Sequence, residues 1–99
     1  MSYQLIFHPQ AEEEYRKAYQ WYEHAQKGLG ERFEKMVEKR LEKIVQYPEN
    51  YHISKASYRE ASTEVFPYTI VYKLNKRKKL IYISAVYHNK RNPQRKYRK

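Results

Sequence analysis

A single histidine followed by a cluster of cations stands near the end of the chain, in the stretch YISAVYHNKRNPQRKYRK. His88 could move a proton, because an unperturbed imidazole titrates close to neutral pH. Arg91 and Arg59 could stabilise negative charge on a phosphate, and Tyr97 could stack on a base or donate a proton. These residue types fit a metal-independent cleavage of RNA, in which a base takes the 2′-hydroxyl proton and an acid protonates the leaving oxygen.

Two other interpretations of this stretch stay open. His88 ends a predicted strand, so it could only cap that strand or pack against the tail. The tail at residues 89–99 predicts a surface for nucleic acid or for an acidic partner, and phosphate contacts of this kind weaken with salt. The cations predicted to bind such a partner are Lys73, which lies outside the tail, and Lys90, Arg91, Arg95, Lys96 and Arg98 within it. A solvated, disordered end is the alternative for residues 97–99.

Other chemistries find little support in the composition. The chain has no cysteine, which excludes disulfides, thiolate catalysis and cysteine-based zinc sites. It also has no aspartate, and its four histidines are too scattered to form a ligand pair: His8, His24, His52 and His88. The basic half contains only two carboxylates, whereas a two-metal nuclease needs several. We therefore expect no metal and no cofactor, and the serines lie in no nucleophile motif.

Charge is divided unevenly along the 99 residues. Residues 1–50 contain eight Lys or Arg and nine Glu, whereas residues 51–99 contain thirteen Lys or Arg and two Glu. This segregation predicts that the second half faces an anionic partner, with improved solubility as the simpler alternative. The length fits a single domain over residues 1–99. The longest apolar run, Leu80–Tyr87, is far too short for a membrane span of about 20 residues, so we expect a cytoplasmic protein without membrane contact.

The elements that must position these residues follow from periodicity. Tyr3–Phe7 predicts a short strand, closed by His8 and Pro9. A helix with one apolar face is predicted from Pro9, with its stripe at Ala11, Tyr15, Ala18, Tyr22 and Ala25. Gly28 suits the left-handed position after a helix. A second helix starts at Leu29 or Gly30 and ends before Pro48, so the two helices predict an antiparallel hairpin.

Strand-like segments follow the helices. Tyr58–Ala61 predicts a short strand, and Phe66–Leu74 alternates with a period of two. The turn NKRKK separates it from Leu80–His88, its predicted antiparallel partner. The predicted fold is α+β, with an N-terminal strand, an antiparallel helical hairpin and a three-stranded antiparallel meander (β-α-α-β-β-β).

Three segments together, WYEHAQKGLGERF, FPYTIVYKL and AVYHNKRNPQRKY, resemble the RelE/ParE superfamily of bacterial toxins from toxin–antitoxin (plasmid stabilisation) modules. The resemblance spans essentially the whole chain and implies this same order of elements. It also implies a neutralising antitoxin whose C-terminal segment wraps the toxin. Some relatives cleave mRNA in the ribosomal A site, and others poison DNA gyrase.

Two departures from the nuclease pattern decide between these branches. Ribosome-dependent nucleases of the superfamily usually have an arginine directly after the aromatic residue that matches Tyr68, where this chain has Thr69. They also have lysines in the preceding strand, where this chain offers only Arg59. Arg91 and Tyr97 match the C-terminal arginine and tyrosine of these nucleases. The long helical hairpin is similar to the ParE branch.

The resemblance therefore predicts a ParE-like toxin that binds DNA gyrase as an inhibitor and is neutralised by a cognate antitoxin. The alternative is a RelE-like, ribosome-dependent endoribonuclease without metal, with His88, Arg91, Arg59 and Tyr97 as its site. A second alternative is an inactive relative or a basic nucleic-acid-binding domain. Whether the protein forms a dimer or a toxin–antitoxin hetero-oligomer is left open.

Overall fold

The computed structural model describes residues 2–91 and 93–99, so Met1 and Asn92 of the predicted domain and tail lie outside the described residues. Two helices follow the first strand and precede the other four. The elements are β1 (Gln4–Phe7), α1 (Pro9–Ala25), α2 (Leu29–Gln46), β2 (Ile53–Lys55), β3 (Tyr58–Ser62), β4 (Tyr68–Asn75) and β5 (Leu80–His88). Both helices and the strand at 80–88 match their predicted bounds closely.

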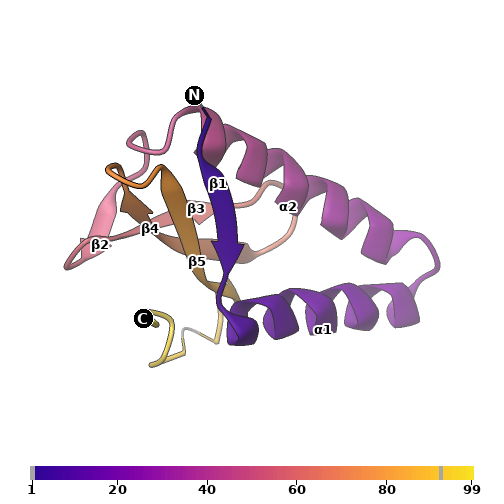
Figure 1. The fold of residues 1–99 in the computed structure, drawn as a ribbon. Helices are drawn as coiled ribbons and strands as arrows, with labels where there is room; N and C mark the ends of the chain where they lie inside the picture. Colours follow the sequence, from indigo (N-terminus) through magenta and orange to yellow (C-terminus); the bar gives the residue numbers. More distant parts are fainter. Residues whose placement is uncertain (1, 92) are drawn as a thin grey trace.

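All five strands form one sheet in the order β1-β5-β4-β3-β2 (Figure 1). β2 to β5 are antiparallel neighbours, whereas β1 pairs in parallel with β5, from Gln4 opposite Leu80 to Phe7 opposite Ile83. The connection between β1 and β5 contains both helices and then β2, β3 and β4, so it is long enough for the crossover that a parallel pair needs. The α+β prediction is confirmed. β2 was not predicted, because it has only three residues and all of them are exposed.

The helical hairpin is fixed by local signals at its ends. The His8 side chain accepts a hydrogen bond from the Gln10 amide at 3.0 Å and so caps α1. Gly28 adopts φ +89°, the left-handed conformation predicted for it, and opens the turn into α2. At Gly30 a Cβ atom would lie 2.8 Å from the Tyr19 carbonyl oxygen. The two helices therefore approach closely at this end because residue 30 has no side chain.

The hairpin covers one face of the sheet and forms the main core with it (Figure 1). Aromatic rings dominate this core near the loop that connects the two helices: the Phe33 ring lies 5.4 Å from Phe66, 5.2 Å from Tyr22 and 5.0 Å from Tyr68, centroid to centroid. Edge-on aromatic contacts of this kind add to the burial of apolar area. We call this side of the sheet the helix face.

The segment 93–99 covers part of the opposite side, which we call the tail face. There Tyr97 packs against Tyr58, Val71, Ala85 and Tyr87. A bulge in β5 makes this possible: Val71 pairs with Ala85 but Tyr72 pairs with Ile83, which leaves Ser84 as the extra residue. The solvated end considered for residues 97–99 is therefore not what the structure shows for Tyr97 and Arg98.

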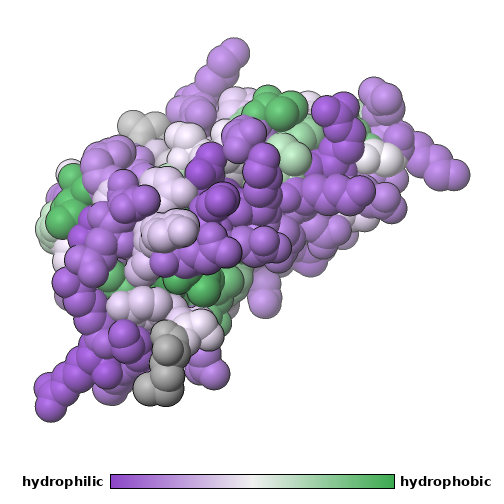
Figure 2. All heavy atoms as spheres, turned by 90° about the horizontal axis from the view of Figure 1, so that it is seen from above, coloured by the Kyte–Doolittle hydropathy of each residue, from purple (hydrophilic) through white to green (hydrophobic). Residues whose placement is uncertain are grey.

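Hydrophilic side chains cover most of the molecular face in Figure 2, and hydrophobic residues form only scattered patches there. Among the described residues, no helix is both long and apolar enough to cross a membrane.

Candidate functional site

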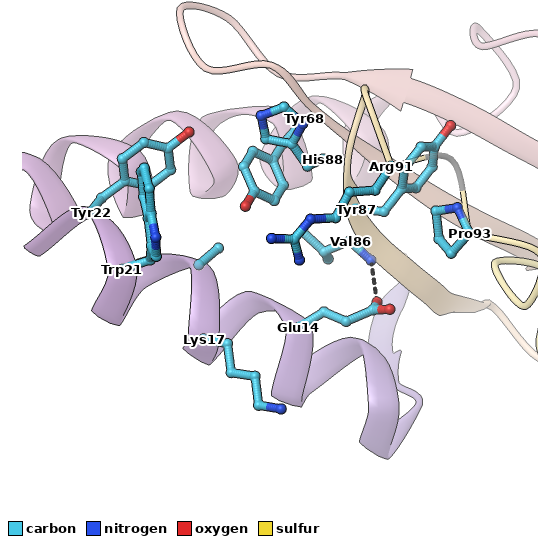
Figure 3. A pocket seen from close by; sticks show the side chains of 11 residues that line it. Glu14, Lys17, Trp21, Tyr22, Tyr68, Val86, Tyr87, His88, Arg91 and Pro93 are labelled. Atoms are coloured by element: carbon cyan, nitrogen blue, oxygen red, sulfur yellow. Dashed lines mark hydrogen bonds between the residues drawn. The ribbon is translucent and has the colours of Figure 1, made fainter. Parts of the chain in front are cut away.

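A groove of about 760 Å³ lies between α1 and the end of β5 (Figure 3). Its walls come from α1, from β4 and from the end of β5 with the segment that follows it. The lining residues are Glu14, Lys17, Ala18, Trp21 and Tyr22, then Tyr68, then Val86, Tyr87, His88, Arg91 and Pro93. The groove thus brings His88 and Arg91 together, as the end of one strand should.

The turn after β5 fixes His88 and Arg91. The His88 carbonyl accepts from the Arg91 amide at 2.9 Å, and His88 Nδ1 accepts from the Lys90 amide at 3.1 Å. This leaves Nε2 as the nitrogen that could exchange a proton with a ligand. The His88 ring meets Tyr68 edge-on, with centroids 5.2 Å apart.

Arg91 is exposed, and its side chain reaches across the groove toward α1 (Figure 3). Within residues 2–91 and 93–99, its guanidinium has neither a hydrogen bond nor an ion pair. Burial and the neighbouring Tyr22 raise the pKa of Tyr68, although the charge of Arg91 opposes this. Tyr68 therefore stays a neutral phenol beside a cation that has its hydrogen-bonding capacity available.

Trp21 forms the rim of the groove and is 67% exposed. Its ring contacts Tyr22 edge-on at 5.2 Å, and Tyr22 in turn packs into the aromatic core. Trp21 was not among the site residues predicted from the sequence. The signal was present, because Trp21 lies outside the apolar stripe of its helix, and a tryptophan that the core does not need often serves an interface.

Glu14 joins three parts of the chain at the other end of the groove. Its Oε1 accepts from the Val86 amide at 3.0 Å, and its carboxylate pairs with the Arg98 guanidinium at 2.8 Å. Arg98 also donates to the Ser84 carbonyl at 2.9 Å. Sequence patterns could not have found this group, because Glu14 and Arg98 are separated by 84 positions.

A second polar cluster lies on the tail face around Glu60. Its carboxylate accepts from the Tyr97 hydroxyl at 2.7 Å and from the Tyr87 hydroxyl at 3.1 Å, and Lys96 Nζ lies 3.4 Å away. Burial works to raise the pKa of Glu60, but the hydrogen bonds from Tyr97 and Ser54 and the charge of Lys96 outweigh it, so the pKa is lowered. Glu60 is therefore ionised at neutral pH and holds the tail.

The remaining predicted residues are dispersed. The Arg59 guanidinium donates to the carbonyl oxygens of Tyr51 at 2.7 Å and Glu49 at 3.3 Å, at the loop before β2. Lys90 and Arg95 are exposed, and Lys73 lies over the Tyr58 ring at 5.5 Å. Of the four candidate nuclease residues, the structure brings together His88 and Arg91 but not Arg59 or Tyr97.

The family of the chain follows from its sequence match. Residues 5–93 match the family described as the ParE toxin of the type II toxin–antitoxin system, parDE. The chain belongs to the ParE toxin family. No curated protein matches it significantly.

The fold is that of solved toxins. The free form of an arginine double mutant of the E. coli toxin RelE is 20% identical, with a TM-score of 0.69 over 93% of this chain and 88% of that chain. The same mutant in complex with a peptide of the antitoxin RelBc is also 20% identical, with a TM-score of 0.64 over 87% of this chain and 82% of that chain. At this identity the likeness establishes the fold, and the predicted superfamily is confirmed.

No group of three or more metal-binding side chains occurs in the described part of the chain. The groove itself offers the imidazole of His88, the guanidinium of Arg91, the ammonium of Lys17, the carboxylate of Glu14 and aromatic rings.

Proposed function

We propose that this ParE-family protein is a cytoplasmic toxin that inhibits DNA gyrase through protein contact and is neutralised by a cognate antitoxin. The observation that supports this most is the separation of the candidate nuclease residues. His88 and Arg91 lie at the groove, next to the helix face, whereas Tyr97 packs on the tail face against Tyr58 and Ala85. An acid and a base that act on one phosphate must both reach it, and here they lie on opposite faces of β5.

Electrostatics on the tail face also disfavour RNA cleavage. A metal-free nuclease needs cations near the phosphate to stabilise the charge of the transition state. Here the carboxylate of Glu60 lies beside Tyr97 and pairs with Lys96 at 3.4 Å, so a negative charge stands next to the candidate acid and compensates this cation. Thr69, which stands where related nucleases have arginine, is buried and donates to Asn89 Oδ1 at 2.6 Å. It supplies no charge to a substrate.

The groove suits a protein segment better than a reaction. An exposed tryptophan beside an arginine that has no partner among the described residues is the composition of an interface hot spot. Arg91 and Lys17 favour a segment with acidic residues, and Trp21 and Tyr68 favour an apolar anchor next to them. The antitoxin is the natural occupant, because a related toxin is known with an antitoxin peptide bound. The complex would be a toxin–antitoxin hetero-oligomer, with a homodimer of the free toxin as the alternative.

A RelE-like endoribonuclease is the second candidate function. His88 and Arg91 favour it, because they share one groove and offer a proton-transfer group beside a cation. This activity would require Tyr97 to leave Glu60 and the tail face.

The two candidates differ in what purified protein does. A gyrase inhibitor should stabilise cleaved DNA when gyrase and ATP are present, and the alanine variants His88→Ala and Arg91→Ala should leave mRNA intact in a translation reaction, as the wild type does. Absence of any cleavage complex, together with mRNA cleavage that His88→Ala abolishes, would refute the gyrase proposal and establish the nuclease.

A further inference from the structure

We propose that the two turns at one end of the sheet form a docking surface for the phosphate backbone of nucleic acid. The cations concerned come from the end of β2, from the second half of β4 and from the β4–β5 turn. They are Lys55, Lys73, Lys76, Arg77, Lys78 and Lys79, and we call them the turn surface.

Strand register brings these residues together. Tyr58 lies opposite both Lys55 on β2 and Lys73 on β4, so the β2–β3 turn sits beside the end of β4. Asn75 pairs with Leu80 across the adjoining β4–β5 turn, which contains the other four cations. All six residues are exposed.

The turn surface has almost no internal compensation. Among the described residues, its only ion pair joins Lys76 to Glu49 at 2.9 Å. Lys55, Lys73 and Lys79 lie over the rings of Tyr97, Tyr58 and Tyr3 at 4.9–5.7 Å, which leaves their charge intact. Six cations beside one paired carboxylate repel one another, and an anionic ligand would relieve that repulsion.

The chemistry of the turn surface favours the phosphodiester backbone of nucleic acid over an acidic protein. Ile53, at the start of β2, is the one exposed large hydrophobic side chain in residues 53–57 or 75–79, so the turns offer little apolar area for a protein interface. Five of the six cations are lysines, which bind phosphate as point charges without fixed geometry. Tyr58 is only 7% exposed, so bases cannot stack on it, and we expect no base preference.

The turn surface is distinct from the groove. Leu80 and His88 stand at opposite ends of β5, about 26 Å apart at the usual rise of a strand. The inference therefore does not depend on gyrase as the target. Lys96 and Arg98 are not counted in the turn surface, because their charges pair with Glu60 and Glu14.

The test is direct binding of the purified full chain to a fluorescent 30-bp DNA duplex, measured by anisotropy from 50 to 200 mM salt. The variant Lys73→Gln/Arg77→Gln/Lys78→Gln removes three cations that form no ion pair with any residue the structure describes. The control Arg32→Gln/Lys35→Gln/Lys43→Gln removes the same charge from the exposed side of α2. Equal urea midpoints would establish that all three proteins are folded.

Six phosphate contacts predict that affinity falls roughly 2000-fold across this salt range, and three contacts predict a fall of about 40-fold. We expect the wild type and the control to show the steep dependence and the turn variant the shallow one. Equal salt dependence in all three proteins would overturn the proposal, as would the absence of duplex binding at 50 mM salt.

Two further ligands identify the source of the phosphates. Comparable binding of a duplex RNA supports recognition of the backbone alone, and tighter binding of either duplex, lost in the turn variant, assigns the surface to that nucleic acid. Binding of a polyglutamate peptide with the same sensitivity to the turn variant, but no binding of either duplex, would overturn the proposal in favour of an acidic protein partner.

Discussion

The docked tail gives a sharp prediction through Ser84, the bulge residue of β5. Its hydroxyl is fully buried, donates to the Lys96 carbonyl at 2.6 Å and accepts from the Arg98 amide. Ser84→Ala removes both hydrogen bonds and creates no steric conflict. At about 1 kcal/mol for each bond, docking of the tail should weaken by about 2 kcal/mol.

The measurement is amide hydrogen exchange, residue by residue. A loss of about 2 kcal/mol should speed exchange of the Arg98 amide by about 30-fold, while amides of β4 and α2 change far less. Ser62→Ala is the matched control, because Ser62 is exposed and in the described structure its hydroxyl has no hydrogen bond. An Arg98 amide that exchanges at the wild-type rate in Ser84→Ala would refute the assignment of Ser84 as the anchor of the tail.

Three more predictions follow from contacts in the fold and the groove. Trp21→Ala should change stability by less than about 0.5 kcal/mol yet weaken antitoxin binding at least about tenfold in calorimetry, whereas the comparably exposed Tyr47→Ala should bind normally. The pKa of Glu60 is lowered from 4.5, so the stability that its carboxylate gives the fold is complete above that pH and is lost as the pH falls through the folded pKa. Urea midpoints measured from pH 7 to 3 should therefore fall less steeply in Glu60→Gln than in the wild type. An unchanged slope would contradict this. Gly30→Ala should destabilise the protein by about 1–3 kcal/mol in urea, despite the higher helix propensity of alanine, because the new Cβ would press on the Tyr19 carbonyl; a stabilised variant would show that the helices can separate there without cost.

The helical hairpin and the last two strands could be predicted because their signals are local. The apolar stripe of α2 at Phe33, Val37, Leu41 and Ile44 is buried as its spacing predicts. Gly28 has the positive φ that its place after a helix indicates. The strand predicted at residues 66–74 begins two residues later in the structure, because Pro67 cannot donate a ladder hydrogen bond.

The second side of the sheet could not be predicted in the same way. Residues 83–87 of β5 are all buried, so their hydropathy no longer alternates, and the bulge at Ser84 changes which side chains face the helices. The tail that covers them is polar in sequence and docks through ion pairs such as Glu14 with Arg98. Local patterns indicate solvent exposure for such residues, and only the tertiary structure supplies their partners.

The parallel pairing of β1 with β5 determines how late in synthesis the fold can be completed. β1 occupies residues 4–7, but its partner is made only when residues 80–83 have been synthesised. Until then β1 has no partner strand and β4 has only β3. The helical hairpin also lacks Ile81 and Ile83 from its core. A chain that stops short of β5 can still pair β2 with β3 and β3 with β4, but it has no partner for β1 and lacks one wall of the groove. We therefore expect the groove to form only after β5 and the following residues Arg91 and Pro93 have been synthesised.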